Sequence, residues 1–239
     1  MTPQLQQAIK LLQLSTLALK QAVQEVLEAI PAAAHPMDVL RTGCSVLGTV
    51  LPEKDEQAPA DAKDIADRLL ASFPSMLLYW YHYSHNGKCI EVETDDDSIG
   101  AHFLHMLHGE KPSKQWEEAM HASLILYAEH EFNASTFTAR VIAGTLADMY
   151  SSITGAIGAL SGPKHGGANE AAMEIIQRYQ SADAAEQDIM ARIANKEIII
   201  GFGHPVYTIS DPRNVAIKAV ARELCEAGGN MNLFAVSER

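Results

Sequence analysis

Two histidines, each inside a glycine-rich stretch, are the residues best placed to do chemistry. His165 lies in Gly-Pro-Lys-His-Gly-Gly-Ala-Asn (162–169), and His204 lies in Gly-Phe-Gly-His-Pro-Val-Tyr (201–207). Glycine has no side chain to block a ligand, and it permits backbone conformations that other residues resist. An imidazole in such a setting can reach a small polar ligand. Because only 39 residues separate the two histidines, we expect them to share one pocket.

The element after the first histidine is predicted to be a helix over residues 169–179. His165 would then lie just ahead of a helix N-terminus, where the positive end of the dipole disfavours a charged imidazolium. A neutral histidine can still donate one N–H bond, as at sites that stabilise an enolate. The alternative, a loop histidine that bonds only to backbone, remains open.

The second glycine-rich stretch follows an apolar run, 198–200, that we expect to be buried. Downstream, Asp211 has the character of an N-cap and Pro212 that of a first helical residue. This helix is expected to end at Gly228. Arg213 would lie in its first turn, where the dipole does not favour a cation but an anionic ligand would relieve the conflict. An ion pair with Asp211 is the alternative.

A third stretch, Tyr-Ala-Glu-His-Glu-Phe-Asn-Ala-Ser-Thr (127–136), contains His130. Taken alone, His130 could equally be a hydrogen-bonded core histidine. Taken together and in their order along the chain, however, the three stretches closely resemble the citrate synthase family. Residues 35–43 resemble it as well. The stretches Leu-Tyr-Trp-Tyr-His-Tyr-Ser-His-Asn-Gly (78–87) and Glu-Thr-Asp-Asp-Asp-Ser-Ile-Gly (93–100) resemble its bacterial 2-methylcitrate synthase subfamily more specifically.

The resemblance implies an acyltransferase that joins an acyl-CoA to oxaloacetate. In this subfamily propionyl-CoA loses a proton alpha to its thioester, the enolate attacks the ketone of oxaloacetate, and hydrolysis releases 2-methylcitrate and CoA. The resemblance also implies a cytoplasmic homodimer of propionate catabolism, with acyl-CoA as a substrate, no cofactor and no metal. A citrate synthase that uses acetyl-CoA is the first alternative, because one methyl group is discriminated by only about 1–3 kcal/mol.

The resemblance assigns roles to individual residues. His165 matches the histidine that bonds the thioester oxygen as the enol forms, and His204 the one that polarises the oxaloacetate carbonyl. His130 and Arg213 match oxaloacetate-binding positions. We therefore expect these four side chains to line one pocket between two helical domains. A further segment matches part of the CoA-contacting region: Ile198, Ile199, Ile200, Gly201 and Phe202.

The resemblance runs from about residue 20 to Arg239 and corresponds to the middle half of a methylcitrate synthase. It places the family's general base, an aspartate, and two more oxaloacetate-binding arginines downstream of Arg239. Impaired activity of residues 1–239 alone is therefore expected, since a general base contributes about 10²–10⁴ in rate. A non-catalytic, truncated interaction protein is the alternative from another class.

The elements that must position these residues are nearly all helical, because strand-like alternation is scarce. We predict an all-α, citrate-synthase-like fold, with a large helical domain over 20–163 and the start of a smaller helical domain over 164–239. An amphipathic helix over 61–73 should be interrupted at Pro74. Gly144 should be a close-packing point within helical runs over 117–153. A further helix is predicted over 182–195.

The first residues have a different character. Residues 1–19 are predicted to form an atypical amphipathic helix. They resemble the glutamine- and leucine-rich N-terminal region of the bacterial alternative (nitrogen-type) sigma factor, so a foreign origin of this segment is one alternative. Apolar residues alternate at spacings of four and three, which is a heptad seam and favours packing on a partner helix. The seam consists of Leu5, Ile9, Leu12, Thr16, Leu19, Val23, Val26 and Ile30.

Composition narrows the function classes. A net charge of −12 argues against a nucleic-acid surface. The three cysteines lack metal-ligand spacing and indicate reduced thiols in the cytosol. No basic, apolar leader and no membrane-length apolar run is seen.

A histidine metal site is a third function class. His102, His105 and His108 recur at every third residue, and for them packing and hydrogen bonding are favoured over metal binding. The acidic run 95–97 is interpreted as a solvated loop rather than a metal site.

Overall fold

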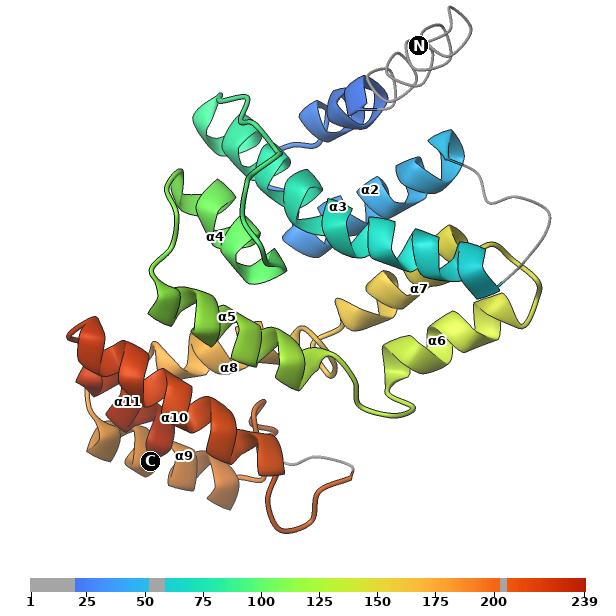
Figure 1. Cartoon of the computed structure of the whole chain (residues 1–239). Helices are drawn as coiled ribbons and strands as arrows, with labels where there is room; N and C mark the ends of the chain where they lie inside the picture. The colour runs from blue at the N-terminus through green and yellow to red at the C-terminus, as the bar shows by residue number, and fades with distance from the viewer. Residues whose placement is uncertain (1–19, 52–58, 203–205) are drawn as a thin grey trace, which may run out of the picture. The chain divides into compact units, whose positions relative to one another are not determined.

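The computed structural model describes residues 20–51, 59–202 and 206–239, and every regular element in these ranges is a helix, as predicted (Figure 1). Residues 20–28 are helical. They are followed by α2 (Pro36–Val50), α3 (Pro59–Asn86), α4 (Ile99–His108), α5 (Lys114–Tyr127), α6 (Ala134–Ala143), α7 (Met149–Leu160), α8 (Ala168–Ile176), α9 (Ala182–Ala194), α10 (Pro212–Ala227) and α11 (Met231–Glu238). Among these helices, none is both long and apolar enough to cross a membrane.

The chain forms two compact units, and neither is continuous in sequence. The first unit holds the described residues up to Lys111 together with Phe132–Ala159, and the second holds Pro112–Glu131 together with Leu160–Arg239. They do not coincide with the predicted ranges 20–163 and 164–239, because α5 packs against α10 and so belongs with the C-terminal helices. Sequence order alone gives no sign of this contact.

The first unit has a deep apolar core formed by residues 20–28, α2, α3 and α7. Val39 and Cys44 are fully buried, and Trp80 and Tyr150 are 2% and 1% exposed. The polar atoms of the two aromatic side chains have partners. The Trp80 Nε1–H donates to the Ile30 carbonyl at 3.2 Å, and the Tyr150 hydroxyl accepts from Arg68 at 2.7 Å. These hydrogen bonds offset the cost of removing the two polar groups from water.

The predicted interruption at Pro74 is wrong, since α3 runs through this residue from Pro59 to Asn86. An internal proline costs a helix about 3 kcal/mol. The residues after Pro74 are anchored in the core, where Met76 is 4% exposed and Leu78 is 2% exposed. Burial of such side chains contributes about 1.5–3 kcal/mol each, which offsets the cost.

Two of the described seam residues pack on their own chain. Val23 is buried in the core of the first unit, and Ile30 packs against that core. The most deeply buried residue of this helix is Leu27, at 2% exposure, which is not a seam position. The helices on which Val23 and Ile30 pack therefore belong to the same chain. The earlier seam positions and the sigma-factor-like residues 1–19 lie outside the described residues.

Gly144 is not the predicted close-packing point. It is the C-cap of α6, and a Cβ atom there would approach only carbonyl groups of its own helix. The close approaches occur at Gly48, where a Cβ would lie 2.6 Å from that of Tyr150, and at Gly155, where it would overlap the Ile142 side chain. The helix predicted over 182–195 is present as α9, with Ser181 as N-cap.

Candidate active site

Arg213 lies where the sequence predicts, in the first turn of α10. Asp211 is the N-cap of this helix and accepts the Arg213 backbone N–H at 2.9 Å. The same carboxylate accepts from Arg213 Nε at 3.0 Å and from Nη2 at 2.6 Å. The structure therefore shows the ion pair given above as the alternative to ligand binding. The hydrogen bond to Asp211 raises the pKa of Arg213 despite partial burial, so the guanidinium is charged and fixed.

His130 lies just beyond the end of α5 and contacts Tyr207. Its Nε2 is 3.0 Å from the Tyr207 hydroxyl, and the two rings meet edge to face with centroids 5.5 Å apart. On the other side, the Arg213 guanidinium carbon lies 5.8 Å from the centre of the Tyr207 ring. Tyr207 thus links His130 to Arg213. Sequence reasoning missed its role, although Tyr207 ends the quoted stretch 201–207.

A cavity of about 760 Å³ opens in the second unit beside Arg213 and Tyr207. Its volume falls within the usual range for sites that bind small molecules and cofactors. Polar and apolar groups share its wall, which includes Asn169 from the first turn of α8 and Tyr127 from the last turn of α5. A charged guanidinium on such a wall can bind a carboxylate.

His165 is half-buried in the loop before α8, and it does not line this cavity. The helix predicted after it is present, with Gly167 as an N-cap that makes no side-chain hydrogen bond. A Cβ at Gly166 would lie 2.5 Å from the Leu160 carbonyl oxygen, and one at Gly167 would lie 2.9 Å from the Ser161 oxygen. These glycines are needed where the loop folds back on the end of α7.

The predicted CoA segment reaches the cavity only at its end. Gly201 and Phe202 line it, and Phe202 is 66% exposed. The expected burial of the isoleucine run holds for Ile199, at 7% exposure, but is wrong for Ile198, at 78%. Residues 198–200 belong to no helix or strand, so no regular packing covers both faces of this segment. Gly201 has a φ of +105°, which a residue with a side chain rarely adopts.

His204 belongs to residues 203–205, which lie outside the described part of the chain. Of the four side chains expected in one pocket, the structure places Arg213 on the cavity wall and His130 behind Tyr207. His130, His165 and Arg213 all belong to the second unit. Within that unit, Tyr207 links His130 to Arg213.

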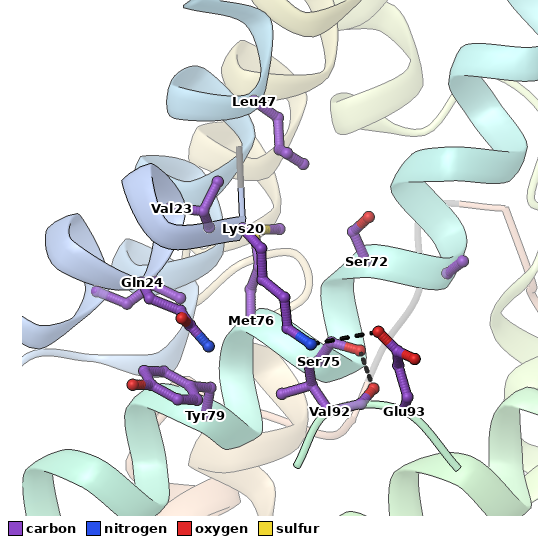
Figure 2. Close-up of a pocket in the computed structure, with 12 residues that line it drawn as sticks. Lys20, Val23, Gln24, Leu47, Ser72, Ser75, Met76, Tyr79, Val92 and Glu93 are labelled. Carbon is purple, nitrogen blue, oxygen red and sulfur yellow. Dashed lines mark hydrogen bonds and ion pairs between the residues drawn. The ribbon is translucent and has the colours of Figure 1, made fainter. Parts of the chain in front are cut away.

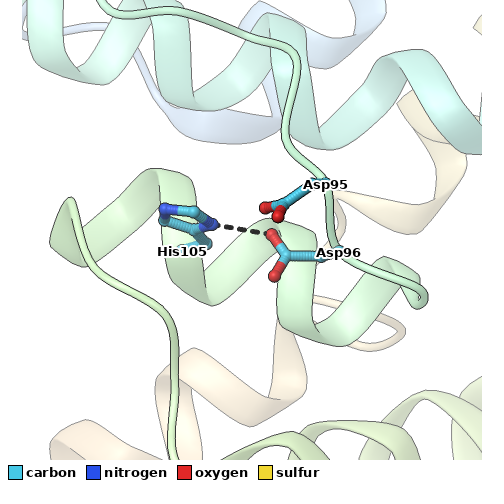
Figure 3. A group of neighbouring side chains, drawn as sticks. All are labelled: Asp95, Asp96 and His105. Atoms are coloured by element: carbon cyan, nitrogen blue, oxygen red, sulfur yellow. Dashed lines mark hydrogen bonds and ion pairs between the residues drawn. The ribbon is translucent and has the colours of Figure 1, made fainter.

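A separate cluster of titratable side chains, formed by Asp95, Asp96 and His105, lies in the first unit (Figure 3). His105 Nδ1 is 2.7 Å from a carboxylate oxygen of Asp96, whose side chain is only 5% exposed. Burial opposes ionisation of Asp96, but hydrogen bonds from Thr94 and His105 outweigh it and hold its pKa below the ordinary value. The interpretation of 95–97 as a solvated loop is therefore wrong for Asp96.

The same cluster has ligand types that suit a cation. One ligand atom each from Asp95, Asp96 and His105 lies within 4.8 Å of the others. Asp95, however, is paired with the ammonium group of Lys111 at 2.9 Å. His102 bonds instead to Thr94 at 2.8 Å. Hydrogen bonding therefore accounts for His102 and His105, as the sequence favoured.

A second cavity, of about 270 Å³, lies in the first unit between residues 20–27, α2 and α3 (Figure 2). Its wall is mainly apolar, with Leu47 and Met76 among its lining residues. Lys20 and Glu93 form an ion pair at its rim, with 3.2 Å between nitrogen and oxygen. None of the predicted site residues lines it.

Comparison with known proteins establishes the family. The family described as "Citrate synthase, C-terminal domain" matches residues 2–239. The chain is 58% identical over 219 residues to a 2-methylcitrate synthase of Shewanella oneidensis, covering 92% of this chain and 58% of that protein. It is 40% identical over 215 residues to a citrate synthase of Heyndrickxia coagulans, covering 90% of this chain and 57% of that protein.

Comparison with solved structures gives the same family. A citrate synthase from Thermoplasma acidophilum, in ternary complex with carboxymethyl coenzyme A and oxaloacetate, superposes with a TM-score of 0.81 at 28% identity, covering 90% of this chain and 56% of that one. The Thermotoga maritima enzyme gives 0.74 at 35% identity, covering 89% and 54%. The chain belongs to the citrate synthase family, and it spans a little over half the length of the relatives it matches.

Proposed function

We propose that the protein contributes the oxaloacetate- and acyl-CoA-binding part of a 2-methylcitrate synthase-like acyltransferase. The observation that carries the proposal is the linked group of His130, Tyr207 and Arg213 beside a cavity of about 760 Å³. Oxaloacetate carries two carboxylates and a ketone. A charged guanidinium suits a carboxylate because it can donate two parallel hydrogen bonds.

Each site residue has a role in this proposal. Arg213 and His130 bind oxaloacetate, and His204 polarises its ketone. His165 donates to the thioester oxygen as the acyl group forms its enolate. Stabilising charge that develops on two oxygens is the main task of such a site. The segment Ile198–Phe202 contacts CoA, and the two residues of it that line the cavity, Gly201 and Phe202, support this.

Propionyl-CoA is the proposed acyl donor, and propionate catabolism in the cytoplasm the proposed setting. Support comes from the 58% identity to a relative named 2-methylcitrate synthase, against 40% to one named citrate synthase. The acyl donors differ by one methyl group, which a pocket distinguishes by about 1–3 kcal/mol. Acetyl-CoA is therefore the competing substrate to test.

We also propose a homodimer. Large apolar side chains on α5 and α6 face solvent within their own units, among them Ile125 at 73%, Phe137 at 59% and Val141 at 54% exposure. Large apolar side chains in contact with solvent are typical of surfaces that become buried in an interface. Sedimentation at micromolar concentration should show dimers or larger assemblies. A single compact species near 26 kDa would contradict this expectation.

Titration calorimetry with oxaloacetate tests the binding role of the site. Arg213→Ala should weaken binding about 10- to 100-fold, because a hydrogen bond to a charged group contributes about 1.5–3 kcal/mol. Arg222→Ala is the matched control, since Arg222 lies on the same helix but pairs with Glu238. Far-UV circular dichroism should show that all variants are equally helical.

Two outcomes would overturn the proposal. In the first, the folded chain fails to bind oxaloacetate, as a non-catalytic interaction protein would. In the second, the two arginine variants bind it equally well. The acyl assignment is tested separately on a complete homologue, and it is overturned if oxaloacetate-dependent release of free thiol is faster from acetyl-CoA than from propionyl-CoA.

A further inference from the structure

Tyr207 contacts both proposed oxaloacetate-binding side chains. Its hydroxyl lies 3.0 Å from His130 Nε2, and its ring lies under the Arg213 guanidinium with 5.8 Å between the ring centre and the guanidinium carbon. Tyr207 is half-buried and lines the cavity itself. His130 comes from the end of α5 and Arg213 from the start of α10, so a single side chain joins the two elements that carry the site.

The hydrogen bond has a chemical consequence for His130. A neutral imidazole has one N–H donor and one acceptor nitrogen. If the phenol O–H donates to Nε2, the ring hydrogen is placed on Nδ1. A carboxylate has no hydrogen to give, so a neutral histidine can bind it only through an N–H group. In that arrangement Nδ1–H is the one N–H donor of the neutral ring.

The contact with Arg213 has a complementary effect. Asp211 holds the guanidinium from one side through Nε and Nη2. The Tyr207 ring supports it from another direction at cation–π distance. A guanidinium held on two sides loses less rotational freedom when it binds a ligand, which favours affinity.

We propose that Tyr207 is a positioning residue of the oxaloacetate site, which donates its hydroxyl hydrogen to His130 Nε2 and orients Arg213 with its ring. The inference rests on the proposed function, because it assumes that these two residues bind oxaloacetate. It adds a residue whose role is exerted through its neighbours.

Tyr207→Phe tests the hydroxyl and leaves the ring in place. This variant should bind oxaloacetate about 2- to 10-fold more weakly, the range expected for one hydrogen bond. Tyr207→Leu should weaken binding further, because it also removes the ring beneath Arg213. Tyr179→Phe is the matched control. It deletes another tyrosine hydroxyl bond of the same unit, the one to Asp188 at 2.5 Å, away from the cavity.

Two further measurements separate positioning from a general structural effect. In the His130→Ala background, Tyr207→Phe should change oxaloacetate affinity by less than about 2-fold, since coupled residues are not additive. The ¹⁵N shifts of the His130 imidazole should report hydrogen on Nδ1 in the parent protein and a move toward Nε2 in Tyr207→Phe. This spectrum needs no ligand.

The outcomes distinguish the two proposals. Oxaloacetate binding that depends on Arg213 but is unchanged in Tyr207→Phe would overturn the role of Tyr207 and leave the proposed function standing. An equal loss with and without His130, or an unchanged imidazole spectrum, would do the same. Failure of the parent protein to bind oxaloacetate would overturn the proposed function, and the role of Tyr207 with it.

Discussion

The two units bury their side chains to very different degrees. In the first, α2 and α3 surround a core in which Trp80 and Val39 are at most 2% exposed. In the second, α8 and α10 contain no buried residue, and Ala185 is the one buried residue of α9. The candidate site residues that the structure describes belong to this second unit.

The difference in burial distinguishes the unit that apolar packing stabilises from the unit that contains the candidate binding site. A unit with a deep core can hold its helices in place by apolar packing alone. The second unit instead presents charged and hydrogen-bonded groups, such as the Asp211–Arg213 pair, around an open cavity. Regions with few buried apolar contacts are the ones that open most easily. We therefore expect core substitutions to affect folding mainly through the first unit.

The two tryptophans give the largest expected contrast. Trp80→Ala should lower the free energy of unfolding by about 3–5 kcal/mol, because it leaves a cavity in the core. Trp116→Ala, on the 52% exposed tryptophan of the second unit, should change it by about 0.5 kcal/mol or less. Denaturant unfolding followed by circular dichroism measures both. Similar losses for the two variants would contradict the comparison.

Helix N-caps give an intermediate contrast. Ser98 accepts the Ala101 N–H at the start of α4 in the first unit, and Ser98→Ala should cost about 1 kcal/mol of unfolding free energy. Asp211→Ala should cost more, up to about 2 kcal/mol, because Arg213 also loses its carboxylate partner. Asp211→Asn keeps a good cap and should fall between parent and Asp211→Ala. The prediction fails if Ser98→Ala proves the more costly change.

The smallest expected effect is a pH dependence in the first unit. Burial lowers the pKa of His102 below its ordinary value of 6.5, with His105 adding to the shift and Asp96 opposing it. The folded state thus favours neutral His102, and this stabilisation is present above about pH 6.5 and is lost as the pH falls. His102→Asn should flatten the decline in unfolding free energy from pH 7 to 5.5. His108→Asn, at an exposed position of the same helix, is the control variant.

Local sequence rules determined the ends of several helices in this protein. Asp211 before Pro212, Ser181 before α9 and Gly109 after α4 set helix ends through hydrogen bonds and dihedral preferences that act within a few residues. The all-helical class followed from periodicity. The order of three motifs indicated the citrate synthase family, which the comparisons confirm.

Contacts between residues far apart in the chain decided the rest. Burial of the residues around Met76 in the core allows α3 to continue through Pro74. The packing of α5 on α10 places His130 beside Tyr207, which is 77 positions further along the chain. Asp96 became buried because His105 and Thr94 satisfy its carboxylate. No local pattern encodes these outcomes, because each depends on the free energy of contacts that form only when distant segments meet.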